Sequence, residues 1–185
     1  MCDEELARHG TSSMDVSNEA RPRLEIEEGW RDISKFSDLL TRNSYVSGEP
    51  EGDRIRMRYW QRIGDGAAVG KAWFGPKAQG PPGYAHGGSQ AALMDEVMGA
   101  AAWIAGHAVF TARLTHHYRQ MLPLLETVRF EAIVDRVEGR KVHVKGFIES
   151  LDGKTYSETE GLFVMISSDR LSDMATRFVG QSSPR

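Results

Sequence analysis

The stretch that decides the fold is Gly83-Tyr-Ala-His-Gly-Gly-Ser-Gln-Ala-Ala-Leu-Met-Asp-Glu-Val-Met-Gly-Ala-Ala-Ala-Trp-Ile-Ala105. It opens with glycines and continues for about five helical turns with apolar residues on almost every side. A helix that is apolar all round is normally buried inside a domain. Asp95 and Glu96 nevertheless lie at its centre, and an unpaired carboxylate is costly to bury. The stretch therefore predicts a central helix in which one of these carboxylates has a function.

Length and composition indicate one globular domain. The chain has 185 residues, of which 40% are hydrophobic and 26% are charged. Its net charge of −3 favours neither nucleic acid nor an anionic membrane as a partner. The single cysteine, Cys2, excludes an intramolecular disulfide framework. Because the amino terminus is acidic and lacks an apolar core, we expect a cytoplasmic protein. The central helix is short for a membrane span and carries two carboxylates.

Composition along the chain divides it into a domain with extensions. Residues 1–22 lack hydrophobic periodicity and predict a disordered tail. Residues 23–50 form an extension, in which Trp30 to Leu40 have apolar residues at helical spacing and predict a short helix. We place the folded domain at 51–168. Residues 169–185 predict a tail with at most one helical turn.

Strand patterns lie on both sides of the central helix. Residues 54–62 alternate between charged and apolar, and Gly64-Asp-Gly66 can turn the chain into a second strand at 67–74. Four candidates follow the helix, at 109–119, 127–136, 141–150 and 155–166, and two of the turns between them are the hairpin signals Glu138-Gly139 and Asp152-Gly153. Hairpins make a sheet antiparallel. We therefore expect an α+β fold in which a curved, mainly antiparallel sheet of about six strands wraps the helix.

This order resembles the hotdog fold. His86-Gly87-Gly88 at the helix start, with Asp95 nine residues after the histidine, resembles the motif of the acyl-CoA thioesterases in that fold, in the PaaI-like and thioesterase-superfamily-member branch. The resemblance extends from about Arg54 to Ile166. One departure is a loop position where several members carry an asparagine; here the loop reads Gln79-Gly-Pro81, so that role is absent or has moved to Gln79 or Gln90.

The resemblance implies hydrolysis of an acyl-CoA thioester without a cofactor. A helix start carries unpaired N–H groups, so Gly87 and Gly88 can polarise the thioester carbonyl, although an isolated glycine pair more often only shapes a tight turn. Asp95 is the candidate general base or nucleophile, and the competing reading pairs it with an arginine at a subunit contact. Thr111 matches the family's hydroxyl position and can hold the attacking water. His86 is expected to orient the helix start.

The remaining candidates have weaker roles. Glu96 lies about 100° from Asp95 around the helix and is expected to be structural. Weak candidates for binding CoA phosphates are Arg113, Arg119 and Lys145. The histidines at 107, 116, 117 and 143 lack metal-ligand spacing, so no metal is expected.

Helix geometry predicts a homodimer without reference to the family. Gly87 and Asp95 are about 12 Å apart along a helix, yet each must lie about 3 Å from the same reacting group. One chain cannot supply both, whereas two antiparallel central helices can. We therefore expect at least a homodimer with two equivalent sites, with a dimer of dimers as an extension. Two further hypotheses are a non-catalytic hotdog module that binds acyl-CoA and, ranked third, a dehydratase of the same fold.

Overall fold

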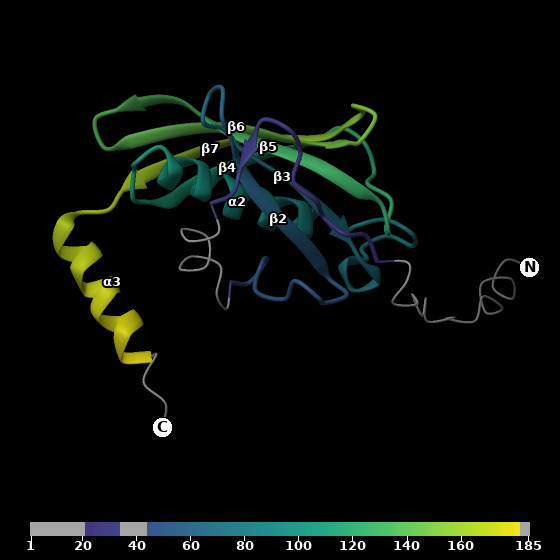
Figure 1. The fold of residues 1–185 in the computed structure, drawn as a ribbon, viewed down its shortest axis with the longest axis horizontal. Helices are drawn as coiled ribbons and strands as arrows, with labels where there is room; N and C mark the ends of the chain where they lie inside the picture. The colour runs from purple at the N-terminus through teal and green to yellow at the C-terminus, as the bar shows by residue number, and fades with distance from the viewer. Residues whose placement is uncertain (1–20, 34–43, 182–185) are drawn as a thin grey trace, which may run out of the picture.

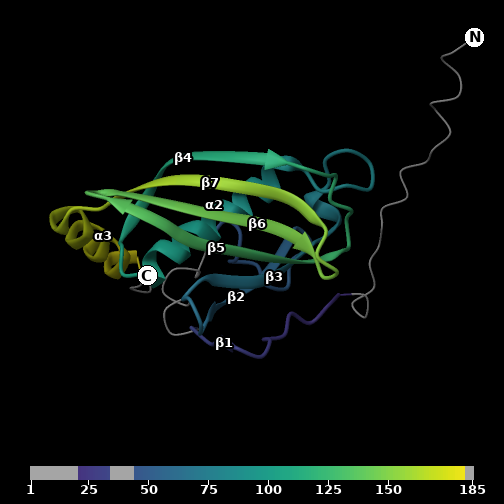
Figure 2. The ribbon, with the colours of Figure 1, turned by 90° about the horizontal axis from the view of Figure 1, so that it is seen from above.

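A single antiparallel sheet wraps one long helix (Figures 1 and 2). The computed structural model describes residues 21–33 and 44–181. The strands have the order β1-β2-β3-β5-β6-β7-β4 across a seven-stranded sheet. Their bounds are β1 Trp30–Arg31, β2 Ile55–Arg62, β3 Ala68–Phe74, β4 Val109–Tyr118, β5 Thr127–Glu138, β6 Lys141–Ser150 and β7 Thr155–Met165; the helices are η2 Pro76–Ala78, α2 Gly87–Ile104 and α3 Ser168–Gln181. The predicted hotdog architecture is confirmed.

Tight turns explain the antiparallel order. Gly66, Gly139 and Gly153 have φ values of 79°, 57° and 89°, which are conformations that side chains disfavour. Each glycine turns one strand back beside the next, in agreement with the hairpin signals in the sequence. Helix α2 separates β3 from β4, and this long connection brings β4 to the free edge of the sheet, beside β7.

Glycines in the sheet make room for α2. A Cβ atom on Gly146 of β6 would lie 2.5 Å from the Met94 Cε atom, and one on Gly161 of β7 would lie 2.9 Å from the Met98 Cε atom. Both methionines are fully buried. The helix therefore lies closer to these strands than any larger residue would allow. This packing fixes which side of α2 faces the sheet and which side remains open.

The amino-terminal segment 21–33 covers part of the outer face of the sheet, opposite α2. Leu24 packs with Trp60 and Val69, and the Trp30 and Trp60 rings lie 5.4 Å apart. Glu27 accepts a hydrogen bond from Arg129 and forms an ion pair with Lys71, each at 2.9 Å. We call residues 21–33 the strap. The outer faces of β4 and β7 lie beyond it.

The extensions differ from the sequence-based expectation. The helix predicted from Trp30 does not begin there, because Trp30 and Arg31 form β1 against the end of β2. The rest of that helix lies outside the described residues, as do residues 1–20 of the tail predicted over 1–22. At the end of that predicted tail, Arg21 forms an ion pair with Asp53 at 2.6 Å. At the other end, α3 is 14 residues long instead of one turn, and it projects from the end of β7 (Figure 1). Among residues 21–33 and 44–181, no helix is long and apolar enough to cross a membrane.

Candidate active site

His86 caps the start of α2. Its Nδ1 atom accepts a hydrogen bond from the Gly88 N–H at 2.9 Å, and its backbone is extended, as an N-cap residue requires. Because Nδ1 is the acceptor, the proton of the neutral ring is on Nε2, and the His86 side chain is exposed. The expected orienting role of His86 fits this geometry. The expectation that both glycines offer free N–H groups needs correction, since the Gly88 N–H is engaged by His86.

Gly87 retains a free N–H group. Within the described residues, no acceptor for the Gly87 N–H is present. The Tyr118 hydroxyl donates a hydrogen bond to the Gly87 carbonyl at 2.9 Å, and a Cβ atom on Gly87 would lie 3.0 Å from the Tyr118 ring. Glycine at this position therefore allows the tyrosine to approach. Tyr118 was not a sequence candidate; its only signal is that it ends the strand that carries Thr111.

Asp95 and Thr111 form a polar pair on the open side of α2. The Thr111 hydroxyl donates a hydrogen bond to the Asp95 Oδ1 atom at 2.7 Å, and both side chains are exposed. The expectation that α2 is covered on every side is therefore wrong for a single chain.

A β-bulge in β4 gives Thr111 its direction. Opposite β7, Thr111 pairs with Phe163 and Arg113 pairs with Leu162, so one extra residue, Ala112, lies between them. If β4 had the same residues but no bulge, Thr111 and Tyr118 would point to opposite faces, because seven positions separate them in a strand of period two. With it, both side chains reach α2.

Glu96 occupies a different environment from Asp95. It is half-buried, one oxygen accepts a hydrogen bond from the Ser44 hydroxyl, and the other is buried without a partner among the described residues. Burial, and secondarily the Glu96 charge, raises the pKa of the Tyr59 hydroxyl. Glu96 thus faces β2 and the loop at Ser44, consistent with its expected structural role.

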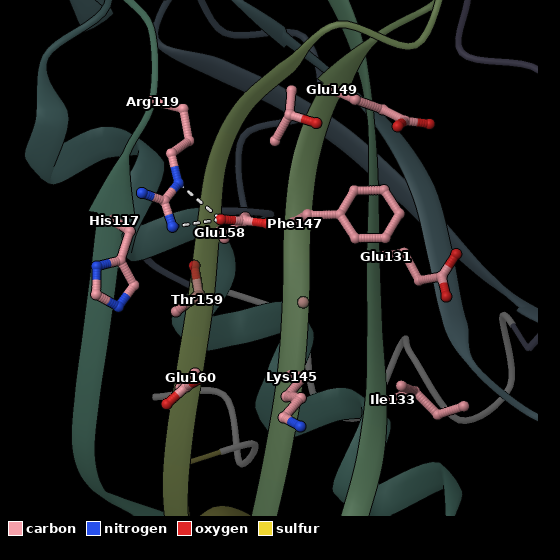
Figure 3. Close-up of a pocket in the computed structure, with 12 residues that line it drawn as sticks. His117, Arg119, Glu131, Ile133, Lys145, Phe147, Glu149, Glu158, Thr159 and Glu160 are labelled. Carbon is pink, nitrogen blue, oxygen red and sulfur yellow. Dashed lines mark hydrogen bonds and ion pairs between the residues drawn. The ribbon is translucent and has the colours of Figure 1, made fainter.

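The three candidates for binding CoA phosphates lie away from the Asp95–Thr111 pair. The register places Arg113 on the outer face of β4. Arg119 and Lys145 line a cavity of about 440 Å³ on the outer face of the sheet (Figure 3). Arg119 pairs with Glu158 at 2.6 Å, and Lys145 pairs with Asp135 at 3.0 Å. The structure therefore does not bring these side chains to the catalytic candidates within one chain.

The two glutamines considered for the missing asparagine have different positions. The Gln79 Oε1 atom accepts a hydrogen bond from the Gly83 N–H at 3.3 Å and supports the loop. Gln90 is 3% exposed and its Oε1 atom has no partner in the described part of the chain. Neither side chain hydrogen-bonds to Asp95 or His86 there. In residues 21–33 and 44–181, no group of three or more His, Cys, Asp or Glu side chains could hold a metal ion.

One long helix wrapped by an antiparallel sheet, with a capped glycine start and a carboxylate–hydroxyl pair, defines a hotdog protein of the thioesterase type. The model of the thioesterase superfamily matches residues 82–157. The acyl-coenzyme A thioesterase THEM4 of Xenopus laevis is 38% identical over 154 residues, which cover 74% of this chain and 68% of that protein. A solved thioesterase superfamily protein is 32% identical, with a TM-score of 0.63, over 79% of this chain and 70% of that one. The chain belongs to the thioesterase superfamily.

Other relatives match over a smaller part of their length. The human acyl-coenzyme A thioesterase THEM5 is 34% identical over 93 residues, which are 50% of this chain but 38% of that protein. The match therefore spans well under half of this relative. Family membership rests on the longer matches to the Xenopus laevis protein and to the solved structure.

Proposed function

We propose that this protein hydrolyses an acyl-CoA thioester to a free acid and CoA. The observation that carries the proposal is the hydrogen bond from Thr111 to Asp95 on the open side of α2, together with the Gly87 N–H at the start of the same helix, which has no acceptor among the described residues. The names of the relatives, acyl-coenzyme A thioesterases, support the substrate class.

Each half of the site has a chemical role. The Gly87 N–H and the Nε2–H of His86 donate hydrogen bonds to the thioester carbonyl oxygen, which becomes negative as the carbon is attacked. Asp95 removes a proton from water, and Thr111 holds that water or the carboxylate in line. Water oxygen bonds to the carbonyl carbon, the carbon–sulfur bond breaks, and the CoA thiolate takes up a proton. In the alternative route, Asp95 attacks first and forms an anhydride that water hydrolyses.

The complete site requires two chains. Gly87 and Asp95 lie about 12 Å apart along α2. Strand β4 has ten residues and, within residues 21–33 and 44–181, pairs on one edge only; it exposes Phe110 and Tyr118 by 48% and 53%. An unpaired edge of this length is normally covered. We infer that two copies pair through β4 in antiparallel orientation.

The contacts of β4 support one register for this proposed pair. Thr111 touches Asp95 near one end of the strand, and Tyr118 touches Gly87 at the other end. A two-fold axis close to Thr115, midway between them, brings the Thr111 of one copy beside the Tyr118 of the other. Asp95 of each chain then faces the Gly87 of its partner, and two equivalent sites result.

The register is tested by Thr115→Glu, which places two like charges opposite each other at the axis. We expect this variant to sediment as a monomer and to lose thioester hydrolysis. Val137→Glu is the matched control, because Val137 is also exposed, at 42%, but lies in the β5–β6 hairpin. A Thr115→Glu dimer with unchanged turnover would show that β4 is not the interface.

The activity itself is tested by release of free thiol from a series of acyl-CoA substrates. Asp95→Asn keeps the shape and removes the base, so we expect kcat to fall by about 100-fold or more. Glu96→Gln is the control, because it makes the same change one residue later on another side of the helix. Undiminished turnover by a folded Asp95→Asn protein would refute the catalytic assignment.

A second candidate is a non-catalytic module that binds acyl-CoA. It is favoured by the loop position where several family members carry asparagine. In this chain the Gln79 side chain accepts a hydrogen bond from the Gly83 N–H and so does not take the role of that asparagine. This candidate predicts saturable acyl-CoA binding by the wild-type protein without thiol release. The same assay, combined with a direct binding measurement, distinguishes the two functions.

A further inference from the structure

Tyr118 is tied to the start of α2 by its hydroxyl and by its ring. The hydroxyl donates to the Gly87 carbonyl at 2.9 Å, and the nearest ring atoms would lie 3.0 to 3.1 Å from a Cβ atom on Gly87. This contact crosses from the edge strand to the first residue of the helix. It orients the peptide group between Gly87 and Gly88.

That peptide group connects Tyr118 to His86. Its carbonyl accepts from Tyr118, and its N–H, on Gly88, donates to the Nδ1 atom of His86 at 2.9 Å. Donors and acceptors in such a chain polarise one another, so each hydrogen bond strengthens the next. The chain ends at the exposed Nε2–H of His86, which is the carbonyl donor of the proposed reaction.

A second histidine supports the tyrosine from behind. The His116 and Tyr118 rings lie 4.5 Å apart, and the His116 Nδ1 atom lies 2.8 Å from the hydroxyl oxygen of Thr159, which is 1% exposed. Burial, and secondarily the nearby His117, lowers the pKa of His116 and favours the neutral ring. Tyr118 is therefore held between a packed imidazole and the helix start.

We propose that Tyr118 is a positioning residue, whose hydroxyl fixes the Gly87–Gly88 peptide and thereby holds His86 as a carbonyl donor. The inference rests on the proposed hydrolysis of thioesters. It adds a residue that the sequence motif does not contain. In the proposed dimer, the same side chain lies beside the partner's Thr111, so it also joins the two halves of each site.

The test is Tyr118→Phe, which keeps the ring and removes the hydroxyl. We expect kcat for acyl-CoA to fall about tenfold with KM unchanged, because one hydrogen bond in the chain is lost. In a His86→Ala background the same change should alter kcat less than about twofold, since Tyr118 acts through His86. Nitrogen-15 NMR of His86 should show the Nε2–H tautomer in the wild type and a larger Nδ1–H fraction in Tyr118→Phe.

Tyr156→Phe is the matched control, because its hydroxyl is also hydrogen-bonded, to Glu126 at 2.7 Å, outside the site. We expect it to leave kcat and the His86 tautomer unchanged. An unchanged tautomer or an unchanged kcat in Tyr118→Phe overturns the positioning role while thioester hydrolysis stands. If the wild type releases no thiol, the proposed function fails, and the NMR comparison still decides whether Tyr118 controls His86.

Discussion

Replacing Thr111 with valine removes a hydroxyl and keeps the branched shape of the side chain. The lost interaction is the 2.7 Å hydrogen bond to the Asp95 carboxylate. Both side chains are exposed in the single chain, so water can replace the hydroxyl, and the free energy of unfolding should change by no more than about 0.5 kcal/mol. For a chain of this length, that change lowers the melting temperature by less than about 2 °C.

The effect on turnover should be much larger. Bound substrate displaces water from the site, and a hydrogen bond to a charged group then contributes about 1.5 to 3 kcal/mol. If the bond acts in the transition state, Thr111→Val lowers kcat by about 10- to 100-fold.

The assay is thiol release with kcat and KM determined separately, alongside thermal unfolding. Thr111→Ser retains the hydroxyl and should recover kcat to within about threefold of the wild type. Equal kcat in the wild type and Thr111→Val would refute a role for this hydroxyl. A melting temperature lowered by more than about 5 °C would show instead that Thr111 is mainly structural.

Three further predictions concern stability. Gly146→Ala, whose Cβ would lie 2.4 Å from a backbone carbonyl of β5, should lower the free energy of unfolding by about 3 kcal/mol. Gly161→Ala should lower it less, because the three atoms nearest its Cβ belong to side chains, and urea unfolding compares the two variants. The pKa of His116 is lowered in the folded protein, so as the pH falls this histidine takes up a proton in the unfolded chain first. The free energy of unfolding should therefore decrease as the pH drops below about 6.5. His116→Phe should reduce this decrease, which denaturant titrations at several pH values measure. Burial alone would raise the pKa of Glu27, but Lys71 and Arg129 lower it by stabilising the charged carboxylate. Glu27→Gln removes this charge, so it should loosen the strap and accelerate amide exchange at Trp30.

The sequence predicted the sheet well because its signals are local. In the strand predicted over 127–136, the alternate residues Val128, Phe130 and Ala132 are at most 2% exposed, as period-two burial requires. The extensions were predicted poorly. Helical spacing of apolar residues from Trp30 onward could not reveal that Trp30 would stack on Trp60, since that contact depends on β2 lying beside it.

The site was predictable only in part. The spacing from His86 to Asp95 placed both residues on one helix, and the structure adds the contact between Asp95 and Thr111. No periodicity could show that His86 engages the Gly88 N–H, because a cap depends on the backbone conformation at the first turn. Tyr118 was missed for a related reason: its approach to Gly87 depends on how the end of β4 packs beside the helix start, and its place on the same face as Thr111 depends on the bulge at Ala112.

That bulge makes the site sensitive to the register of a single strand. In a regular strand with the same residues, paired with β7 from Arg113 onward, Ala112 would lie opposite Phe163 and Thr111 opposite Val164. Thr111 would then point to the outer face, away from Asp95, while the rest of the strand and its edge kept their places. Deleting Ala112 would instead leave Thr111 opposite Phe163, on the face that points to α2. In this strand, the pairing of one residue decides whether the carboxylate has its hydroxyl partner.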